Sequence, residues 1–153
     1  MPRISNIEML QRNEQPTVSI RTRTQVTKLP MLIGESYSKM SAYLNETGQI
    51  LADVPFVAYH NLDMNDLDVE IGFPLSNSLP GKDDIKAGCI PAGKFVFCMY
   101  RGSYGETEPT YNEIAQWIEE HGLKPTGISY EYYYNGPEFP ESEALTMIAI
   151  PII

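Results

Sequence analysis

The chain has 153 residues, of which 42% are hydrophobic and 20% are charged. These values are typical of one compact domain and leave no room for a second full-sized one. Eleven Lys and Arg stand against 20 Asp and Glu, for a formal net charge of -9. Binding to nucleic acid or to an anionic membrane needs a basic surface, so neither partner is expected. The negative field instead favours positively charged small molecules.

The N-terminal segment lacks the apolar stretch of a signal peptide, and no eighteen apolar residues run together. We therefore expect a cytoplasmic protein without a membrane span. Cys89 and Cys98 are not spaced as a metal-binding pair, and we expect both thiols to be reduced and mostly buried. Because His60 and His121 lack partners at metal-ligand spacing, no metal site and no cofactor are predicted.

In the first half of the chain, the residue pattern predicts the order strand, helix, strand, strand. Apolar and polar residues alternate over 17–24, as in a strand with one buried face. Pro30 then opens an amphipathic helix, which Gly48 ends. The two strands that follow are predicted over 55–61 and 67–75.

The second half repeats this order. A strand is predicted over 94–100, and Pro109 opens a second amphipathic helix. The last two strands are predicted over 128–135 and 145–153. Between the halves, 84–90 is expected to form a short connecting strand rather than a domain linker.

The two halves are expected to be copies of one unit. Three pairs of residues share an offset of 77 positions: Val18 with Phe95, Met40 with Trp117, and Pro74 with Pro151. We predict a single domain over 1–153 with an internal repeat of about 16–76 and 93–153. The expected fold class is α+β, in which two pseudo-symmetric units form one antiparallel sheet with two helices and a central ligand groove.

The most unusual segment is the predicted strand ISYEYYYN at 128–135. Side chains alternate between the two faces of a strand, so Glu131 and Tyr133 share one face. Tyr59 is the mirror of Tyr133 in the first half, and Val57 is the mirror of Glu131. One carboxylate thus breaks the symmetry of two tyrosines.

A carboxylate among aromatic rings is suited to an organic cation. It loses hydration, which raises its pKa, and a bound cation offsets that loss by charge pairing. Tyrosine faces add a cation–π attraction of roughly 0.5 to 2 kcal/mol per ring. The alternative interpretation is a solvated strand face on which Glu131 is simply exposed.

Other candidates carry less information. Tyr104 lies in RGSYG, which is not a phosphate-binding loop and is interpreted as a strand-to-helix turn that brings Tyr104 to one edge of the groove. Glu70 is expected to face solvent. Trp117 has the helical spacing of a core residue, with ligand contact as its alternative, and the same holds for Tyr37.

Several longer motifs together resemble the GyrI-like, AraC-type effector-binding domain family. They are DVEIGFP at 68–74, PAGKFVFCMYRGSYGETEPTYNEIAQWIEEHGLKPTG at 91–127, the YEYYYN strand and the final LTMIAIPI strand. The resemblance implies two SHS2-type modules and a groove for bulky, often cationic compounds. In multidrug-sensing members, a glutamate on the strand after the second helix meets the cation.

Carried over to this sequence, the resemblance implies a ligand site made by Glu131 and Tyr133. It adds Tyr59 and Tyr104 and, with less support, Tyr37 and Trp117. Members that regulate transcription also carry a helix-turn-helix domain, for which this chain has neither the length nor a basic segment. The expectation is a stand-alone module.

Three functions follow from this reading. The first is a non-enzymatic protein that sequesters or senses hydrophobic, cationic aromatic compounds. The second is a hydrolase that detoxifies reactive small molecules, with Glu131 as the catalytic general base. The third is a ligand-modulated module that contacts a protein partner, of the gyrase-inhibitor kind.

Overall fold

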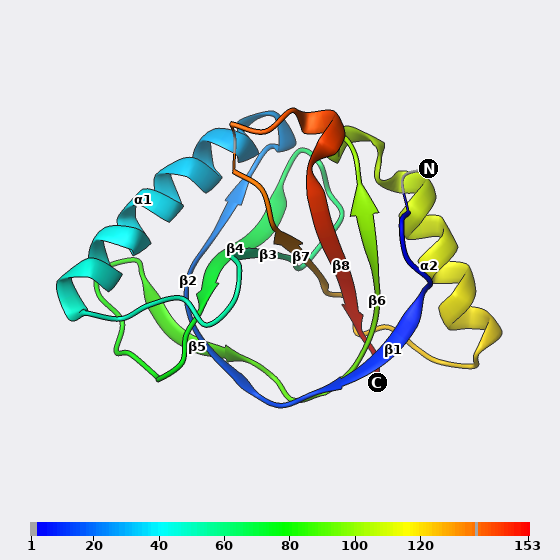
Figure 1. Ribbon diagram of the computed structural model, residues 1–153, viewed down its shortest axis with the longest axis horizontal. Helices are drawn as coiled ribbons and strands as arrows, with labels where there is room; N and C mark the ends of the chain where they lie inside the picture. Colours follow the sequence, from blue (N-terminus) through cyan, green and yellow to red (C-terminus); the bar gives the residue numbers. More distant parts are fainter. Residues whose placement is uncertain (1–2, 137) are drawn as a thin grey trace. The chain divides into compact units, whose positions relative to one another are not determined.

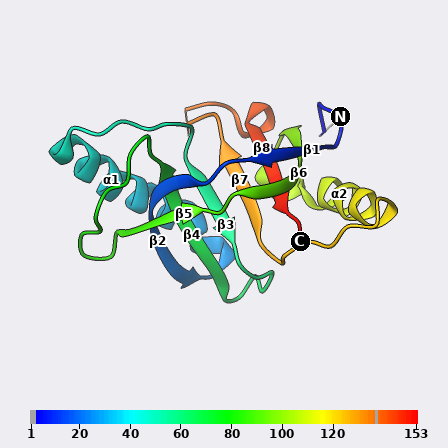
Figure 2. The same ribbon diagram turned by 90° about the horizontal axis from the view of Figure 1, so that it is seen from below.

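The computed structural model describes residues 3–136 and 138–153, which form two compact units. We call Asn13–Ala92 the α1 unit. The other unit combines the first residues of the chain, up to Arg12, with Gly93–Ile153, and we call it the α2 unit. Each unit carries one long helix and four antiparallel strands (Figures 1 and 2).

In the α1 unit, the strand order is β3-β4-β2-β5, and every neighbouring pair is antiparallel. The helix covers one face of this sheet. Its elements are β2 (Gln15–Thr24), the 3-10 turn Val26–Lys28, α1 (Leu29–Thr47), β3 (Phe56–Tyr59), β4 (Leu67–Pro74) and β5 (Lys86–Ile90).

Local sequence explains the limits of α1 and its buried face. Pro30 lies in its first turn, where a missing N–H is tolerated. Gly48 follows the last turn with φ of 72°, a left-handed conformation that favours glycine. Met40 and Leu44 are buried one turn apart, and Tyr37 packs its ring on Phe73 of β4 at 5.4 Å between centroids.

In the α2 unit, the strand order is β1-β6-β8-β7, again antiparallel throughout. Ile114 and Ile118 of the helix form a core cluster with Val96 and Cys98 of β6 and Ile148 of β8. The elements are β1 (Glu8–Arg12), β6 (Gly93–Arg101), the 3-10 turn Tyr104–Glu106, α2 (Glu108–Glu120), β7 (Ser129–Tyr133), the 3-10 turn Glu141–Glu143 and β8 (Leu145–Pro151).

The structure confirms the α+β class, the two helices and the antiparallel strands of each half. β1 was not predicted, and it forms by pairing with β6 along its whole length. The expectation of buried thiols is wrong for Cys89, which is exposed, and right for Cys98; both cysteines are free. The repeat bounds 16–76 and 93–153, and a groove between the halves, stay predictions.

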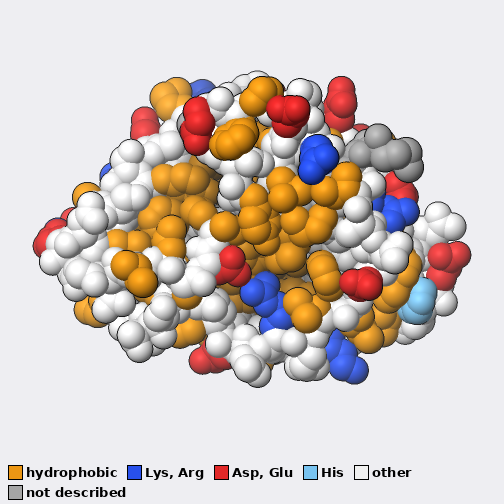
Figure 3. Space-filling model, viewed as in Figure 1, with side chains coloured by type: hydrophobic (Ala, Val, Ile, Leu, Met, Phe, Trp, Pro, Cys, Tyr) orange, Lys and Arg blue, Asp and Glu red, His pale blue; other side chains and the backbone are white. Residues whose placement is uncertain are grey.

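The surface mixes charge and apolar side chains. Figure 3 shows hydrophobic side chains gathered on the face in view, whereas the acidic groups there are scattered singly. No helix in the described part of the chain is long and apolar enough to cross a membrane.

A close contact in the α1 unit generates a stability prediction. The ring of Phe56 on β3 lies over Gly72 on β4, where an added Cβ would come within 2.3 Å of the ring. Gly72→Ala should therefore lower the free energy of unfolding by roughly 1 to 3 kcal/mol. Urea unfolding, monitored by circular dichroism, measures this change in the free energy of unfolding.

The matched control is Gly88→Ala on β5, where the added Cβ would meet its nearest neighbour at an ordinary 3.6 Å. Equal stability of the two variants would contradict the packing argument.

Candidate functional site

The candidate site is centred on Glu131 in the middle of β7. Its backbone pairs with Ile148 of β8, which in turn pairs with Cys98 of β6. Residues directly opposite one another share a face of the sheet, so Glu131 points to the face that α2 covers. Only 8% of Glu131 is exposed, which excludes the solvated strand face considered above.

Two tyrosine hydroxyls hold the carboxylate. The hydroxyl of Tyr111, on α2, donates to Oε2 of Glu131, and the hydroxyl of Tyr133 donates to Oε1 over 2.9 Å. Tyr111 also contacts the hydroxyl of Ser129, two residues before Glu131, at 2.8 Å. Strand alternation brings Ser129, Glu131 and Tyr133 together on one face, and α2 supplies the fourth group.

Burial controls the charge of this carboxyl. It raises the pKa of Glu131 above the ordinary glutamate value, because water no longer solvates the charged form. The hydrogen bonds from Tyr111 and Tyr133 oppose that effect by stabilising the carboxylate, but they do not cancel it. Compared with an exposed glutamate, this carboxyl therefore favours its protonated form.

Tyr104 extends the aromatic surroundings. Its ring meets the ring of Tyr133 edge to face, with centroids 5.4 Å apart and planes at 79°. Glu141 fixes the turn that carries Tyr104 by accepting hydrogen bonds from the Ser103 hydroxyl at 2.9 Å and from the Tyr104 backbone N–H at 3.3 Å. Burial, with the charges of Glu141 and Glu131, raises the pKa of Tyr104.

An open hollow of about 640 Å³ borders the same turn. Glu106, Glu141 and Arg101 are among the side chains that line it, so its rim carries charges of both signs.

Two buried hydroxyls near the cluster lack a partner among the described residues. One belongs to Thr146, which pairs with Tyr133 across β8 and β7, and the other to Thr110, which precedes Tyr111 on α2. Buried polar groups are usually hydrogen-bonded. A bound molecule or water would satisfy these two.

The structure brings together three of the six predicted ligand residues: Glu131, Tyr133 and Tyr104. Trp117 lies elsewhere on α2, where it packs against the core cluster and stacks on His121 at 3.7 Å between ring centroids. Tyr59 ends β3 and Tyr37 lies on α1, both in the α1 unit. For all six residues, ligand contact stays a prediction.

Sequence reasoning missed Tyr111, although it is the residue from α2 that reaches Glu131. Its position three residues before Ile114 gives it the spacing of an apolar helix stripe, where a tyrosine is interpreted as a core residue. The signal that could have found it is the buried stripe itself. Tyr111 precedes the buried Ile114 by three positions, just as Tyr37 precedes the buried Met40, so the structure matches Met40 with Ile114 and not with Trp117 as the sequence offset predicted.

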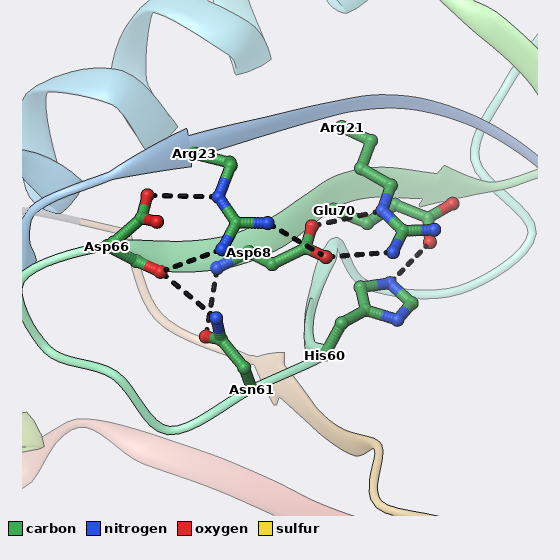
Figure 4. Close-up of polar contacts among 7 residues, drawn as sticks. All are labelled: Arg21, Arg23, His60, Asn61, Asp66, Asp68 and Glu70. Atoms are coloured by element: carbon green, nitrogen blue, oxygen red, sulfur yellow. Dashed lines mark hydrogen bonds and ion pairs between the residues drawn. The ribbon is translucent and has the colours of Figure 1, made fainter.

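A second polar cluster lies on β2, β4 and the end of β3 in the α1 unit (Figure 4). Arg21 forms two hydrogen bonds with Asp68, at 3.0 and 2.9 Å, and Arg23 pairs with Asp66 at 2.9 Å. His60 lies 3.0 Å from Glu70, which also accepts a hydrogen bond from Ser19 over 2.7 Å.

This cluster corrects one expectation from the sequence. Glu70 does not simply face solvent, because it is partly buried and bound on both carboxylate oxygens. The carboxylates of this cluster are paired with arginine, histidine or serine side chains, so we interpret the cluster as a structural one. Residues 3–136 and 138–153 contain no group of three or more His, Cys, Asp and Glu side chains arranged to hold a metal ion.

The comparisons with known proteins agree with this fold. The model of the GyrI-like small molecule binding domain matches residues 5–153. The C-terminal domain of EcmrR is similar, with a TM-score of 0.80 and 22% identity over 97% of each chain. EcmrR in complex with DNA gives a TM-score of 0.83 and 21% identity, with 96% of this chain aligned. This chain spans only 57% of that longer one.

Two further structures are similar at lower identity. SAV2435, solved with bound tetraphenylphosphonium, has a TM-score of 0.68 and 10% identity over 97% of this chain and 94% of its own. A hydrolase from Listeria innocua has a TM-score of 0.75 and 13% identity over 100% of this chain and 94% of its own. No curated protein matches.

The buried carboxyl predicts how stability depends on pH. The pKa of Glu131 is raised in the folded state, so the fold retains a proton that the unfolded chain releases above about pH 4.3. Stability contributed by this group is therefore lost as the pH rises. Glu131→Gln should be more stable than the wild type at about pH 8 by roughly 1 to 3 kcal/mol, and this advantage should shrink near pH 4.

Thermal and urea unfolding at both pH values measure the difference. Glu119→Gln, at the exposed end of α2, is the matched control and should have the same pH dependence of stability as the wild type, because it leaves Glu131 in place. A wild type that is more stable than Glu131→Gln at the higher pH would contradict the pKa direction.

Proposed function

We propose that this chain, which belongs to the GyrI-like small-molecule-binding family, binds hydrophobic organic cations and thereby sequesters or senses them. The observation that carries this proposal is the buried carboxyl of Glu131. Its partners are the phenol hydroxyls of Tyr111 and Tyr133, and no Lys or Arg in the described ranges forms an ion pair with it. The carboxyl at the centre of the site thus has no cationic partner among the described residues.

A cationic aromatic ligand supplies what the site lacks. Its charge pairs with Glu131 in surroundings where little water competes. The faces of Tyr133 and Tyr104 attract the same cation through their ring quadrupoles. The rings also provide apolar surface that accepts ligands of different shapes, because stacking requires no exact pattern of hydrogen bonds.

The same surroundings favour binding over catalysis. A general base needs a lone pair that is free to take a proton from water. Both oxygens of Glu131 already accept hydrogen bonds from tyrosine hydroxyls, and only 8% of the residue is exposed, so a water molecule has little access to the carboxylate. The hydrolase hypothesis uses the same residue, so a turnover assay separates the two functions.

SAV2435, which has a similar fold, was solved with tetraphenylphosphonium bound. This likeness supports an organic cation as the ligand, but the proposal rests on Glu131. Tetraphenylphosphonium and tetraphenylborate have nearly the same shape and opposite charge. They therefore test the role of charge at constant apolar area.

We expect the wild type to bind tetraphenylphosphonium and to reject tetraphenylborate. Glu131→Gln should weaken binding of the phosphonium by roughly 30-fold or more, which corresponds to about 2 kcal/mol or more for a buried charge pair. The discrimination between the two ions should fall by a similar factor. Calorimetric titration of both ions into both proteins measures this.

Glu119→Gln removes the same charge from an exposed position and serves as the control, because it alters only the net charge. Equal phosphonium affinity in the wild type and in folded Glu131→Gln would overturn the proposal. Consumption of an electrophilic ester or epoxide substrate that depends on Glu131 would replace it with the hydrolase function.

A further inference from the structure

One edge of the sheet in the α1 unit is only half covered. β2 pairs with β4 over Thr17–Thr24, but with β5 only over Gln15–Ser19. Among the residues that the structure describes, no strand pairs with the other edge of β2 beyond Ser19. The Pro16 carbonyl accepts from Leu75, on the β4 side. The N–H and C=O groups of successive residues point to opposite edges of an antiparallel strand. Pro16 and the other even-numbered residues of β2 therefore face β4, and the backbone groups of Arg21 and Arg23 point to the open edge.

The α2 unit shows what the matching edge looks like when it is covered. Val57, Ile71 and Ile20 form one row across β3, β4 and β2. Glu131, Ile148 and Cys98 form the matching row across β7, β8 and β6. Ile20 thus corresponds to Cys98, and the next residue, Arg21, corresponds to Met99. This match places Val18 with Val96, one residue beyond the Phe95 that the sequence offset of 77 predicted.

In the α2 unit, an extended segment lies on that edge. The N–H of Ile4 donates to the Met99 carbonyl over 3.0 Å, and the N–H of Met99 donates to the Ser5 hydroxyl over 2.8 Å. Arg3 forms a bridge with Tyr100 and an ion pair of 2.8 Å with Glu113 of α2. This segment leads directly into β1, which pairs with the rest of the same edge, and Figure 2 shows β1 and β6 side by side.

In the α1 unit, β5 starts at the position that matches the start of β1. Lys86, its first residue, pairs with Ser19, and Glu8, the first residue of β1, pairs with Phe97, which corresponds to Ser19. The chain before β5 does not continue along β2. It turns through Lys82 and Ile85, which exchange backbone hydrogen bonds of 2.8 and 2.9 Å. The edge at Arg21 is thereby left open.

Beside this edge lies a hollow of about 190 Å³ between β2 and α1. Ile20 and Leu32 give it an apolar wall, and Glu35, Lys39 and Asp84 line its mouth. Lys39 is paired with Asp84 at 2.9 Å. Glu35 forms no hydrogen bond or ion pair within the described part of the chain; it lies in the field of Lys39, but that ammonium is held by Asp84, so the three groups together leave one net negative charge at the mouth.

The side chains of Arg21 and Arg23 do not obstruct the edge. Both guanidinium groups point toward β4, where Arg21 binds Asp68 and Arg23 binds Asp66 (Figure 4). The backbone of β2 is thus accessible on its other side.

We propose that the open edge of β2 at Arg21–Thr24 is a docking site for an extended segment of a partner protein, which adds as a strand. The segment takes the place that Arg3–Ser5 has in the α2 unit. It carries an apolar side chain for the hollow and a basic side chain for Glu35, as Arg3 meets Glu113. Backbone hydrogen bonds give affinity, and the hollow and Glu35 give specificity. This site is separate from Glu131 and does not depend on the proposed ligand.

The probe is a fluorescein-labelled synthetic peptide, Arg-Ile-Ser-Ile-Arg, and its binding is measured by fluorescence anisotropy. We compare Arg21→Pro with Arg21→Ala. Both variants lose the ion pair with Asp68, but only proline removes the backbone N–H at the open edge. The wild type and Arg21→Ala should bind the peptide with similar affinity, and Arg21→Pro should bind it about tenfold more weakly or worse. Circular dichroism confirms that each variant is folded.

Charge reversal tests the second part of the proposal. Glu35→Lys should weaken binding of the basic peptide, and the same change at Glu119 should have less effect. Hydrogen exchange at the amides of Arg21 and Arg23 should slow when the peptide is bound.

Three results would overturn the proposal: no saturable binding of the peptide by the wild type, equal binding by Arg21→Pro and Arg21→Ala, or equal effects of the two charge reversals. Self-association of the free protein that Arg21→Pro abolishes would assign the edge to a second copy of the chain and would also overturn it.

Discussion

The candidate site depends on one unfavourable placement, the burial of the Glu131 carboxyl on the sheet face that α2 covers. A charge removed from water must be neutralised, hydrogen-bonded or paired. This protein provides hydrogen bonds from Tyr111 and Tyr133, but within the described residues no paired cation. Burial of this carboxyl lowers the free energy of unfolding at neutral pH. In exchange, Glu131 contributes more free energy to the binding of a cation than an exposed glutamate would. Such an exchange is common at functional sites.

Duplication of the unit explains where the asymmetry arises. Both units place a helix on a four-stranded antiparallel sheet, and both bury a matching stripe of the helix. The matching row holds Val57 in one unit and Glu131 in the other, so a core position in the α1 unit becomes a charged position in the α2 unit. The same comparison distinguishes the two edges. Arg3–Ser5 covers one, whereas the chain turns away at Lys82 and leaves the other open.

Much of the fold could be predicted from the sequence, because periodicity, Pro30, Pro109 and Gly48 mark both helices and most strands through local physics. β1 could not, because its residues are largely exposed and it forms only by pairing with the distant β6. For the site, strand alternation correctly grouped Glu131 with Tyr133. Tyr111 required knowledge of which helix residue meets the strand, and the Glu70–His60 contact depended on two strands coming into register.

The central claim is that a buried, protonatable Glu131 receives the positive charge of a ligand. It is tested most directly by ¹³C NMR of protein labelled at the glutamate carboxyl carbons, with the Glu131 signal assigned by its loss in Glu131→Gln. In the free protein, this carboxyl should titrate at a higher pH than the other glutamates, and tetraphenylphosphonium should shift its titration to lower pH by favouring the ionised form. A Glu131 signal that titrates with the exposed glutamates and does not respond to the cation would contradict the account.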